Sequence, residues 1–476
     1  MSMMFSLSEI VNATEGRLIY SNNVMQDIGT IYVTGVSKDS RTIEEGQLFV
    51  ALKGEKFDGH EFCEEVKEKG AIVQLISDEN KCANGTISII VEDTVVAIGK
   101  LARYYRFKHN MKTICVTGSI GKTSTREMIA LGLSYDKKVF STKKNENNEI
   151  GLAFTILSAP EDTEILVLEM GMRKRDEISY LTNIACPDIA CITNVGYCHI
   201  ERLGSREEIL LAKTEIIQGI QSGGFLVIND DDELLRNYCM NNLPCNMFLA
   251  STSIVGPSKD IVSVNASNIT MDEEGTVFDA DLLCRGQSSH IRDVRIKDYG
   301  IHHVRNAMFA FACALILGIN TDKVTSQLLE YKQMAGRGMI IHTPKYTIID
   351  DAYNASIESM EAAFANLNVV GKNQRKIACL GGMLEMGSFA PFLHEKTGLD
   401  CANYDFDFVI LTGDNKVDFV RGYNEGKGKA KIIECENSRD VMDSLLKIIK
   451  PNDCILFKAS NAFGFQKYAE ELSKVD

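Results

Sequence analysis

No run of apolar residues in this 476-residue chain approaches the ~18 residues that a membrane-spanning helix requires. The opening stretch MSMMFSLSEIVNATEGRLIY lacks a basic leader and a signal-peptide cleavage pattern, and Glu9 interrupts its apolar residues. An excess of positive charge is absent too, because the formal net charge is -14 at pH 7. We therefore expect a cytoplasmic protein that has no membrane span and does not bind nucleic acid.

The sequence also lacks tandem repeats and low-complexity tracts. Hydrophobic residues make up 45% of the chain and charged residues 24%, a balance typical of globular rather than disordered proteins. At ~150 residues per domain, the length predicts about three domains.

Most of the 14 cysteines lie inside apolar segments such as TICVT, IACLG and DCILF, which predicts buried, reduced thiols. One group, in CPDIACITNVGYCH, raises the alternative of a zinc site made of Cys186, Cys191, Cys198 and His199. The spacing from Cys186 to Cys191 falls just outside the common structural pattern, and Cys191 lies in a strand-like run. Buried thiols are therefore the preferred interpretation.

Strand-like apolar runs alternate with helical patterns along most of the chain, which predicts α/β domains with mostly parallel sheets. We expect an N-terminal domain at residues 1–107, a central domain at 108–334 and a C-terminal domain at 335–476. The strand-like runs are QLFVAL, AIVQLI and ISIIVE in the first domain, TICVT, EILVLE, DIACIT and FLVIN in the second, and YTIID, KIACLGG, DFVILTG and DCILFKAS in the third. Residues 252–296 predict several short strands, and HHVRNAMFAFACALILGI predicts a helix after them.

The stretch TICVTGSIGKTSTREMI predicts a buried strand, a glycine turn and a helix that begins near Lys122. Backbone N–H groups at such a helix N-terminus suit a phosphate, Lys122 can add positive charge, and Thr123 can offer a hydroxyl to Mg²⁺. The spacing is shorter than the common G-x-x-x-x-G-K-[ST] pattern, because Gly118 is the only nearby upstream glycine. An ordinary strand-turn-helix with a surface lysine is the alternative.

Glu169 is a second candidate, because it ends the apolar run EILVLE and projects from the carboxyl edge of a predicted strand. Ligands gather at that edge in an open α/β sheet, and a carboxylate there can bind Mg²⁺. A solvated loop residue is the alternative for a glutamate at the end of a strand.

Lys213 is a third candidate, in the predicted helix SREEILLAKTEIIQGIQ, which has a capping box of Ser205 and Glu208. The apolar face of this helix consists of Ile209, Ile216, Ile217 and Ile220. Lys213 falls within that face, where burial favours the neutral amine, and a neutral amine can react with carbon dioxide to give an anionic carbamate that binds metal. A lysine that snorkels past its neighbours is the alternative. His199, shortly upstream, could supply a neutral imidazole.

These pieces occur together, and in the same order, in the Mur ligases of peptidoglycan synthesis, which the chain resembles over nearly its whole length. The matching stretches are VTGSIGKTST, KNENNEIG, LEMGMRKRDEISYLTNIACPDIACITNVGYCHIERLGS, LAKTEI, GIHHVRNA and IIDDAYNASIESM. The short G-x-x-G-K-T loop is typical of that family. NNEIG, EMGM and the N-terminal GVSKDSRTIEEGQLFVALKGEKFDGHEF are most similar to the members that join D-alanyl-D-alanine to UDP-N-acetylmuramoyl-tripeptide.

The resemblance implies a three-domain α/β architecture with an N-terminal UDP-substrate-binding domain, a central P-loop ATPase with a parallel sheet, and a C-terminal Rossmann-like domain. It implies ATP and two Mg²⁺ ions as cofactors, and a monomer that acts in cell wall biogenesis, cell shape and cell division. The tripeptide carboxylate would attack the γ-phosphate of ATP to give an acyl phosphate, which the amine of D-alanyl-D-alanine would then attack.

Residue roles follow from the same resemblance. The ATP phosphates would be held by Gly118, Ser119, Gly121, Lys122, Thr123 and Ser124, with Lys122 on the γ-phosphate. Thr123 and Glu169 would bind one Mg²⁺, and His199 and carbamoylated Lys213 would bind or support the second. The nucleotide would contact Asn306 at its adenine, Arg337 at its phosphates, and Asp351 at its ribose, with Tyr353 nearby. The UDP-sugar-peptide would contact Asn147 and Asn148, and its UDP end Ser40 and Arg41.

The chain departs from the family pattern at four places. KKNENN has Lys144 where a glycine is usual, and YNASI replaces YNANP at Ser356 and Ile357. GGMLEMG has Gly382 in place of an aspartate, and KASNA replaces KGSRG at Ala459, Asn461 and Ala462. The C-terminal changes leave open a specialised amide ligase with a different amine, since asparagine cannot clamp a carboxylate as arginine does. A non-catalytic nucleotide-binding regulator is disfavoured by the joint presence of all the candidate metal residues. A folylpolyglutamate synthetase is disfavoured by the N-terminal UDP-site pattern.

Overall fold

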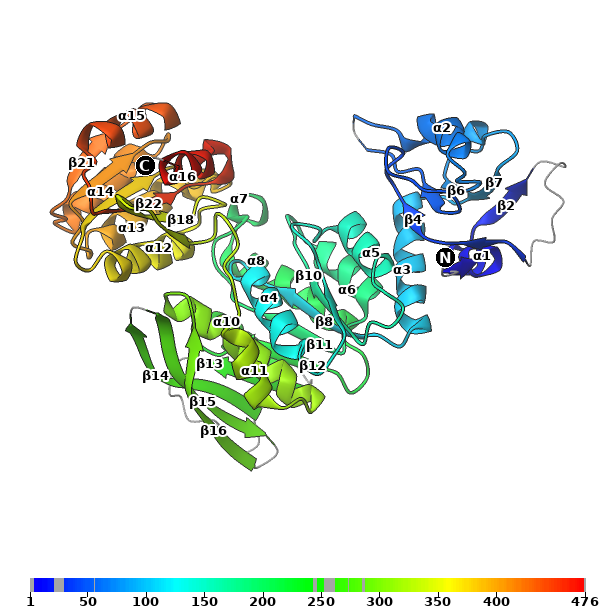
Figure 1. Ribbon diagram of the computed structural model, residues 1–476, viewed down its shortest axis with the longest axis horizontal. Coiled ribbons are helices and arrows are strands. Elements are labelled where there is room, and N and C mark those ends of the chain that lie inside the picture. The colour runs from blue at the N-terminus through cyan, green and yellow to red at the C-terminus, as the bar shows by residue number, and fades with distance from the viewer. Residues whose placement is uncertain are drawn as a thin grey trace.

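The computed structural model describes residues 4–20, 30–54, 56–242, 246–251, 262–272, 274–284 and 287–474. These residues form three α/β domains that follow one another in chain order, with the central domain between the other two (Figure 1). The predicted fold class is confirmed. The predicted boundary after residue 107 falls in the last turn of helix α3, Thr94–Lys108, and the boundary after residue 334 falls between helix α11, Thr321–Leu328, and strand β17, Met339–His342.

The N-terminal domain contains a five-stranded sheet in the order β2-β7-β6-β5-β4, parallel except for β2. Its elements are β1 Phe5–Ser6, α1 Leu7–Thr14, β2 Arg17–Tyr20, β3 Tyr32–Val33, β4 Val36–Ser37, β5 Leu48–Val50, α2 Cys63–Glu68, β6 Val73–Ile76 and β7 Ile87–Ile90. Strand β6 is buried at every position, as the run AIVQLI predicts. Helix α3 leads from this domain into the central one (Figure 1).

The central domain is built on a nine-stranded sheet in the order β16-β15-β14-β13-β12-β11-β8-β10-β9. The strands are β8 Lys112–Thr117, β9 Val139–Ser141, β10 Ile165–Glu169, β11 Ile189–Ile192, β12 Phe225–Asn229, β13 Asn246–Ser251, β14 Val262–Asp272, β15 Gly275–Cys284 and β16 Gln287–Ile296. The helices, besides α11, are α4 Lys122–Leu133, α5 Glu149–Leu157, α6 Glu177–Ala185, α7 Ile200–Leu203, α8 Arg206–Thr214, α9 Glu233–Asn242 and α10 Ile301–Leu317.

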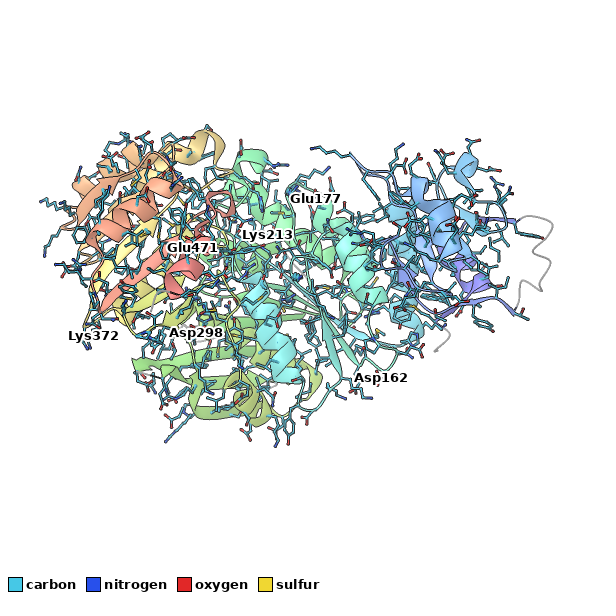
Figure 2. The ribbon with its side chains drawn as sticks, turned by 45° about the horizontal axis from the view of Figure 1, so that its top comes forward. Asp162, Glu177, Lys213, Asp298, Lys372 and Glu471 are labelled. Atoms are coloured by element: carbon cyan, nitrogen blue, oxygen red, sulfur yellow. The ribbon has the colours of Figure 1, made fainter. Side chains whose placement is uncertain are left out.

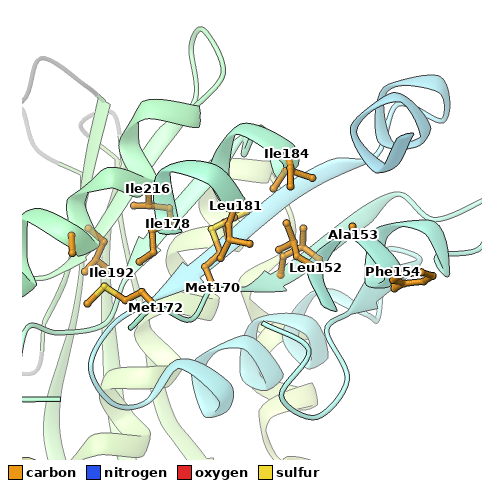
Figure 3. Packing of buried hydrophobic residues seen from close by; sticks show 14 of the residues in the cluster. Leu152, Ala153, Phe154, Met170, Met172, Ile178, Leu181, Ile184, Ile192 and Ile216 are labelled. Carbon is orange, nitrogen blue, oxygen red and sulfur yellow. The ribbon is translucent and has the colours of Figure 1, made fainter. Parts of the chain in front are cut away.

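Both faces of this sheet are covered, because β10 and β11 are buried at every position and β8 at every position after Lys112. Side chains alternate along β8, so Ile114 and Val116 join the cluster that contains α4 and α10 residues, and Cys115 joins the opposite cluster. Figure 3 shows that second cluster, in which α5 and α6 pack beside the end of β10. The labelled members include Leu152, Met170, Ile178, Leu181 and Ile192.

Two sequence predictions need correction in this domain. The predicted short strands of residues 252–296 are three long ones, because β14 continues the sheet beside β13 and then pairs antiparallel with β15, which pairs with β16; residues 252–261 lie outside the described part. The predicted single helix from Ser205 ends as α8 at Thr214 and continues as a 3-10 turn, Glu215–Gly219. Ser205 caps the helix, but Glu208 pairs with Arg175 instead of closing a capping box.

The C-terminal domain has a six-stranded sheet in the order β17-β18-β22-β19-β20-β21, parallel except for β17. Its strands, besides β17, are β18 Tyr346–Asp350, β19 Arg375–Leu380, β20 Phe408–Leu411, β21 Lys431–Glu434 and β22 Asp453–Lys458. Its helices are α12 Ile357–Val370, α13 Ala390–Cys401, α14 Lys416–Glu425, α15 Ser438–Ile448 and α16 Phe465–Ser473. Across the described ranges of all three domains, no helix combines the length and the apolar character needed to cross a membrane.

Candidate active site

The turn between β8 and α4 forms a phosphate-sized loop at the carboxyl edge of the central sheet. Gly118 and Gly121 both have positive φ, at 152° and 78°, and Gly121 begins α4 without any side-chain cap. A Cβ atom on Gly118 would lie 1.9 Å from Thr193 Oγ1, so the loop can pack against the end of β11 only with glycine there. The first N–H groups of α4 therefore remain free for an anion.

Lys122 folds over this loop. Its Nζ donates to the carbonyl oxygens of Gly118 at 2.8 Å and Ser119 at 3.1 Å. Burial lowers the pKa of Lys122, and the nearby Glu169 carboxylate partly opposes that shift. A cation held by backbone carbonyls alone can turn toward a stronger acceptor, such as a phosphate oxygen.

Thr123 and Glu169 meet as the sequence predicts. Thr123 Oγ1 donates to Glu169 Oε2 at 2.9 Å, and Asn147 Nδ2 donates to Glu169 Oε1 at 2.9 Å. Glu169 is 2% exposed and sits at the end of β10, next to the loop. A hydroxyl and a carboxylate are oxygen donors of the kind that Mg²⁺ takes beside nucleotide phosphates, so this pair fits a Mg²⁺–nucleotide site.

Lys213 is buried in α8, 1% exposed, which excludes the alternative of a lysine that snorkels to solvent. Burial, and then the charge of Lys122, lower the pKa of its amine to about 7. Burial, and then the charges of Lys122 and Lys213, lower the pKa of His199, while Glu385, whose Oε2 lies 2.9 Å from His199 Nδ1, opposes that shift. A substantial neutral fraction near neutral pH is what carbamate formation on Lys213 requires. Figure 2 shows Lys213 among the side chains of the central domain.

The alternative of a zinc site is not supported. Within the described ranges, no group of three or more histidine, cysteine, aspartate or glutamate side chains could hold a metal ion. Cys186 Sγ donates to Asn183 O at the end of α6, and Cys191 lies inside β11 with its Sγ 3.9 Å from Cys313 Sγ. The described cysteines are free thiols, and most of them are buried.

The loop opens into a cleft of about 1100 Å³ between the central and C-terminal domains. Four predicted nucleotide residues line it from both sides. Asn306, from α10, accepts from Thr125 Oγ1 at 3.0 Å and lies beside Gly121, while the Arg337 guanidinium stacks 4.1 Å from the Tyr353 ring centroid. Asp351 forms an ion pair with Lys458 at 2.9 Å.

Lys458 is a site residue that the sequence analysis missed. It is 2% exposed, lines the cleft, and donates to Asn354 O at 2.8 Å as well as pairing with Asp351. Its signal in the sequence is the one used for Glu169, because it is a charged residue at the end of an apolar strand, DCILFK. Burial raises the pKa of Asp351, and the Lys458 ammonium opposes that rise.

Some predicted residues lie elsewhere. The Asn148 side chain accepts from Gly151 N at 2.8 Å as the cap of α5, and it is Asn145 and Asn147 that line the cleft. Ser40 and Arg41 belong to the N-terminal domain, apart from the cleft. Arg41 is exposed and donates to Asp39 at 2.6 Å. Their predicted roles stay predictions.

Sequence comparison divides the chain into three matched segments. Residues 32–106 match the Mur ligase family catalytic domain, residues 116–314 the Mur ligase middle domain, and residues 336–461 the Mur ligase glutamate ligase domain. The UDP-N-acetylmuramoyl-tripeptide–D-alanyl-D-alanine ligase of Bacillus subtilis (strain 168) is 34% identical and covers 98% of this chain and 97% of its own length. The enzyme of that name from Escherichia coli (strain K12) is 30% identical over 80% of this chain and 82% of its own.

Solved structures agree with this match. A crystal structure of MurF from Acinetobacter baumannii superposes with a TM-score of 0.85 at 27% identity and covers 99% of both chains. The MurF ligase from Thermotoga maritima, solved in complex with ADP, gives a TM-score of 0.76 at 27% identity and covers 92% of this chain and 98% of its own.

Proposed function

The chain belongs to the Mur ligase family, and on that premise we propose that it joins D-alanyl-D-alanine to UDP-N-acetylmuramoyl-tripeptide with ATP. The reaction would serve the cytoplasmic synthesis of peptidoglycan precursors, with the protein acting as a monomer. The observation that carries the proposal is that Lys122 and the Thr123–Glu169 pair line one interdomain cleft, while Lys213 is buried close enough for the charge of Lys122 to help lower its pKa.

The chain's own groups suit the transfer of a phosphoryl group. The free N–H groups of α4 and the Lys122 ammonium would hold the terminal phosphate of ATP, and Arg337 would reach the phosphates from the C-terminal side. Thr123 and Glu169 would hold one Mg²⁺, and His199 and carbamoylated Lys213 the second. Bound Mg²⁺ neutralises charge on the phosphates.

No enzyme nucleophile is needed. The tripeptide carboxylate attacks the γ-phosphate, ADP leaves, and the resulting acyl phosphate is attacked by the dipeptide amine, with phosphate as the second leaving group. The cleft lies between two domains, and the predicted UDP-contacting residues lie in the third, so domain closure would bring the reactants together.

The surroundings of Gly382 are a reason to test amines other than D-alanyl-D-alanine. An ideal Cβ on Gly382 would lie 3.3 Å from the Phe463 ring and 3.7 Å from His394 Nε2, so Phe463 occupies much of the space that the usual aspartate would need. The test is phosphate release with UDP-N-acetylmuramoyl-tripeptide and a panel of amines. Turnover that requires D-alanyl-D-alanine supports the proposal, whereas turnover only with another amine would overturn it.

Lys213 provides a second test. We expect Lys213→Ala to lower ligation by about 10²- to 10³-fold, the scale of losing one group that stabilises the transition state. Carbon dioxide removal should reduce the activity of the parent protein and bicarbonate should restore it. A carbamate resonance from isotopically labelled bicarbonate, present in the parent and absent in Lys213→Ala, is the readout independent of turnover. An active Lys213→Ala protein and no response to carbon dioxide would refute the assignment.

A further inference from the structure

Glu358 reaches from the C-terminal domain onto the loop that leaves β11. It lies in the first turn of α12, and its Oε1 accepts from Tyr197 N at 2.9 Å. An ideal Cβ on Gly196 would lie 2.2 Å from the same oxygen, so the carboxylate can rest here only because residue 196 is a glycine. Gly196 N in turn donates to Ser119 Oγ of the phosphate loop at 2.8 Å.

The other oxygen of this carboxylate has no partner. Glu358 Oε2 is buried, lines the cleft and makes no hydrogen bond. A buried acceptor left unsatisfied is costly and calls for an explanation, and a catalytic role for the free oxygen is one such explanation. Three other carboxylates of the cleft wall already have partners: Glu169 with Thr123 and Asn147, Asp232 with Val195 N and Leu235 N, and Asp351 with Lys458.

The position of Glu358 suits the second step of the proposed reaction, in which the amine attacks the acyl phosphate. Glu358 and Lys122 line the same cleft, and Gly196, against which the carboxylate rests, donates to Ser119 of the phosphate loop. The carboxylate therefore lies near the groups proposed to hold the reacting phosphate. The amino group of a dipeptide is mostly an ammonium at neutral pH and must lose a proton before it can attack. A free carboxylate oxygen at this place can accept that proton.

We propose that Glu358 Oε2 binds the ammonium of the incoming amine and acts as the base that activates it. One N–H bond breaks and its proton passes to Oε2. The amine lone pair then forms the C–N bond to the acyl phosphate carbonyl. The tetrahedral intermediate breaks its C–O bond, and the departing phosphate takes the second N–H proton, which leaves a neutral amide. This inference rests on the proposed function, because it assumes an acyl phosphate and an amine acceptor.

Glu358→Gln is the sharpest variant, because glutamine keeps an oxygen for Tyr197 N but is not a base. Glu361→Gln is the matched control, since Glu361 lies on the same helix and lines the same cleft. Each protein is assayed in full length with UDP-N-acetylmuramoyl-tripeptide and ATP, either with D-alanyl-D-alanine or with hydroxylamine. Hydroxylamine is neutral at pH 7 and traps an acyl phosphate as a hydroxamate without help from a base.

We expect Glu358→Gln to lose about 10²- to 10⁴-fold in ligation of D-alanyl-D-alanine, the usual scale of general base catalysis, while hydroxamate formation stays within a few-fold of the parent. Glu361→Gln should change neither rate. Equal losses in both assays would assign Glu358 to phosphoryl transfer or cation binding, and unchanged rates in both would leave it a domain contact, so either result overturns the inference. A parent protein that forms no hydroxamate would instead refute the proposed function.

Discussion

At the scale of single residues, the site is marked by ionisable side chains that the fold has withdrawn from water. Glu169, Lys213 and Lys458 are each nearly inaccessible, and a buried charge is tolerated only where a partner or ligand compensates for it. Lys458 has Asp351 as its partner. Lys213 makes no ion pair within the described structure. The free-energy cost of burying its amine is therefore best explained by a chemical role of that amine.

A second buried cluster is centred on His303, a buried residue of the cleft wall. His303 Nε2 lies 3.5 Å from Asp298 Oδ2 and 3.0 Å from Gln333 Nε2. Burial raises the pKa of Asp298 to about 7 and lowers the pKa of His303 to about 4. Both groups are therefore predominantly neutral in the folded protein between those values.

This cluster predicts a pH-dependent effect of Asp298→Asn. The folded protein holds a proton on Asp298 from its ordinary pKa of 3.8 up to about 7, so rising pH in that window lowers stability. Asparagine removes this loss and can still accept from Tyr299 N, as Asp298 does at 2.9 Å. The opposing contribution of His303 is present in both proteins. We expect the denaturant midpoint of the variant, relative to that of the parent, to increase as pH rises from 5 to 8. A difference between the two midpoints that stays constant with pH would contradict this.

At the scale of secondary structure elements, the site exists because three parallel strands end together. Glu169 pairs with Val116, and Ile192 pairs with Thr117, so β8, β10 and β11 bring the phosphate loop, the carboxylate and the Thr193 turn to one edge. Thr193 Oγ1 donates to Ile120 O at 2.6 Å and thereby holds the phosphate loop. The loop conformation thus depends on β11 as much as on its own sequence.

Gly118→Ala should therefore weaken nucleotide binding. The added Cβ would collide with Thr193 Oγ1, and the positive φ is strained for alanine, so ~1–3 kcal/mol of strain would displace the loop. We expect ADP affinity, measured by calorimetry, to fall about tenfold or more.

Gly223→Ala is the control for backbone strain alone. Gly223 has φ 78°, and no atom lies within 4 Å of an ideal Cβ. It should lower stability while ADP affinity remains that of the parent. Unchanged ADP affinity in Gly118→Ala would show that the loop tolerates the extra atom.

At the scale of the whole molecule, two residues of the C-terminal domain contact the loop between β11 and α7 and the start of α7. Glu358 accepts from Tyr197 N, and Glu385 lies against His199, with Glu201 N also 3.4 Å from Glu385 O. The C-terminal domain thereby supports the residue predicted to hold the second Mg²⁺. The N-terminal domain lies on the other side of the central one (Figure 1).

Glu385→Ala should weaken metal binding through His199. Outer partners of ligating histidines typically contribute 10- to 100-fold in metal affinity, because they fix the ring and its tautomer. We expect a loss of that size for Mn²⁺ in the presence of ADP, followed by electron paramagnetic resonance. Glu385→Gln, which keeps an acceptor oxygen, should lose less. Equal Mn²⁺ affinity in the parent and Glu385→Ala would show that the contact between Glu385 and His199 does not contribute to metal binding.

Local patterns determined much of this protein. The apolar runs predicted the central strands of all three sheets but not strands β2, β4, β9, β13, β17 and β21. The glycine spacing predicted the phosphate loop, and Lys213 was found because a charge interrupts an apolar helix face. These features depend on residues close together in the chain, where periodicity and turn chemistry act directly.

Only the tertiary structure decided the rest, because it depends on residues far apart in sequence. In the tertiary structure, Asn148 caps α5 and Lys458 pairs with Asp351. Helix α8 ends earlier than predicted, and β14 extends the central sheet. The tertiary structure also places Glu358 on Gly196, across 162 residues of chain (358 minus 196). Such pairings follow from how whole domains pack against each other, and no local sequence pattern records which distant backbone a side chain will meet.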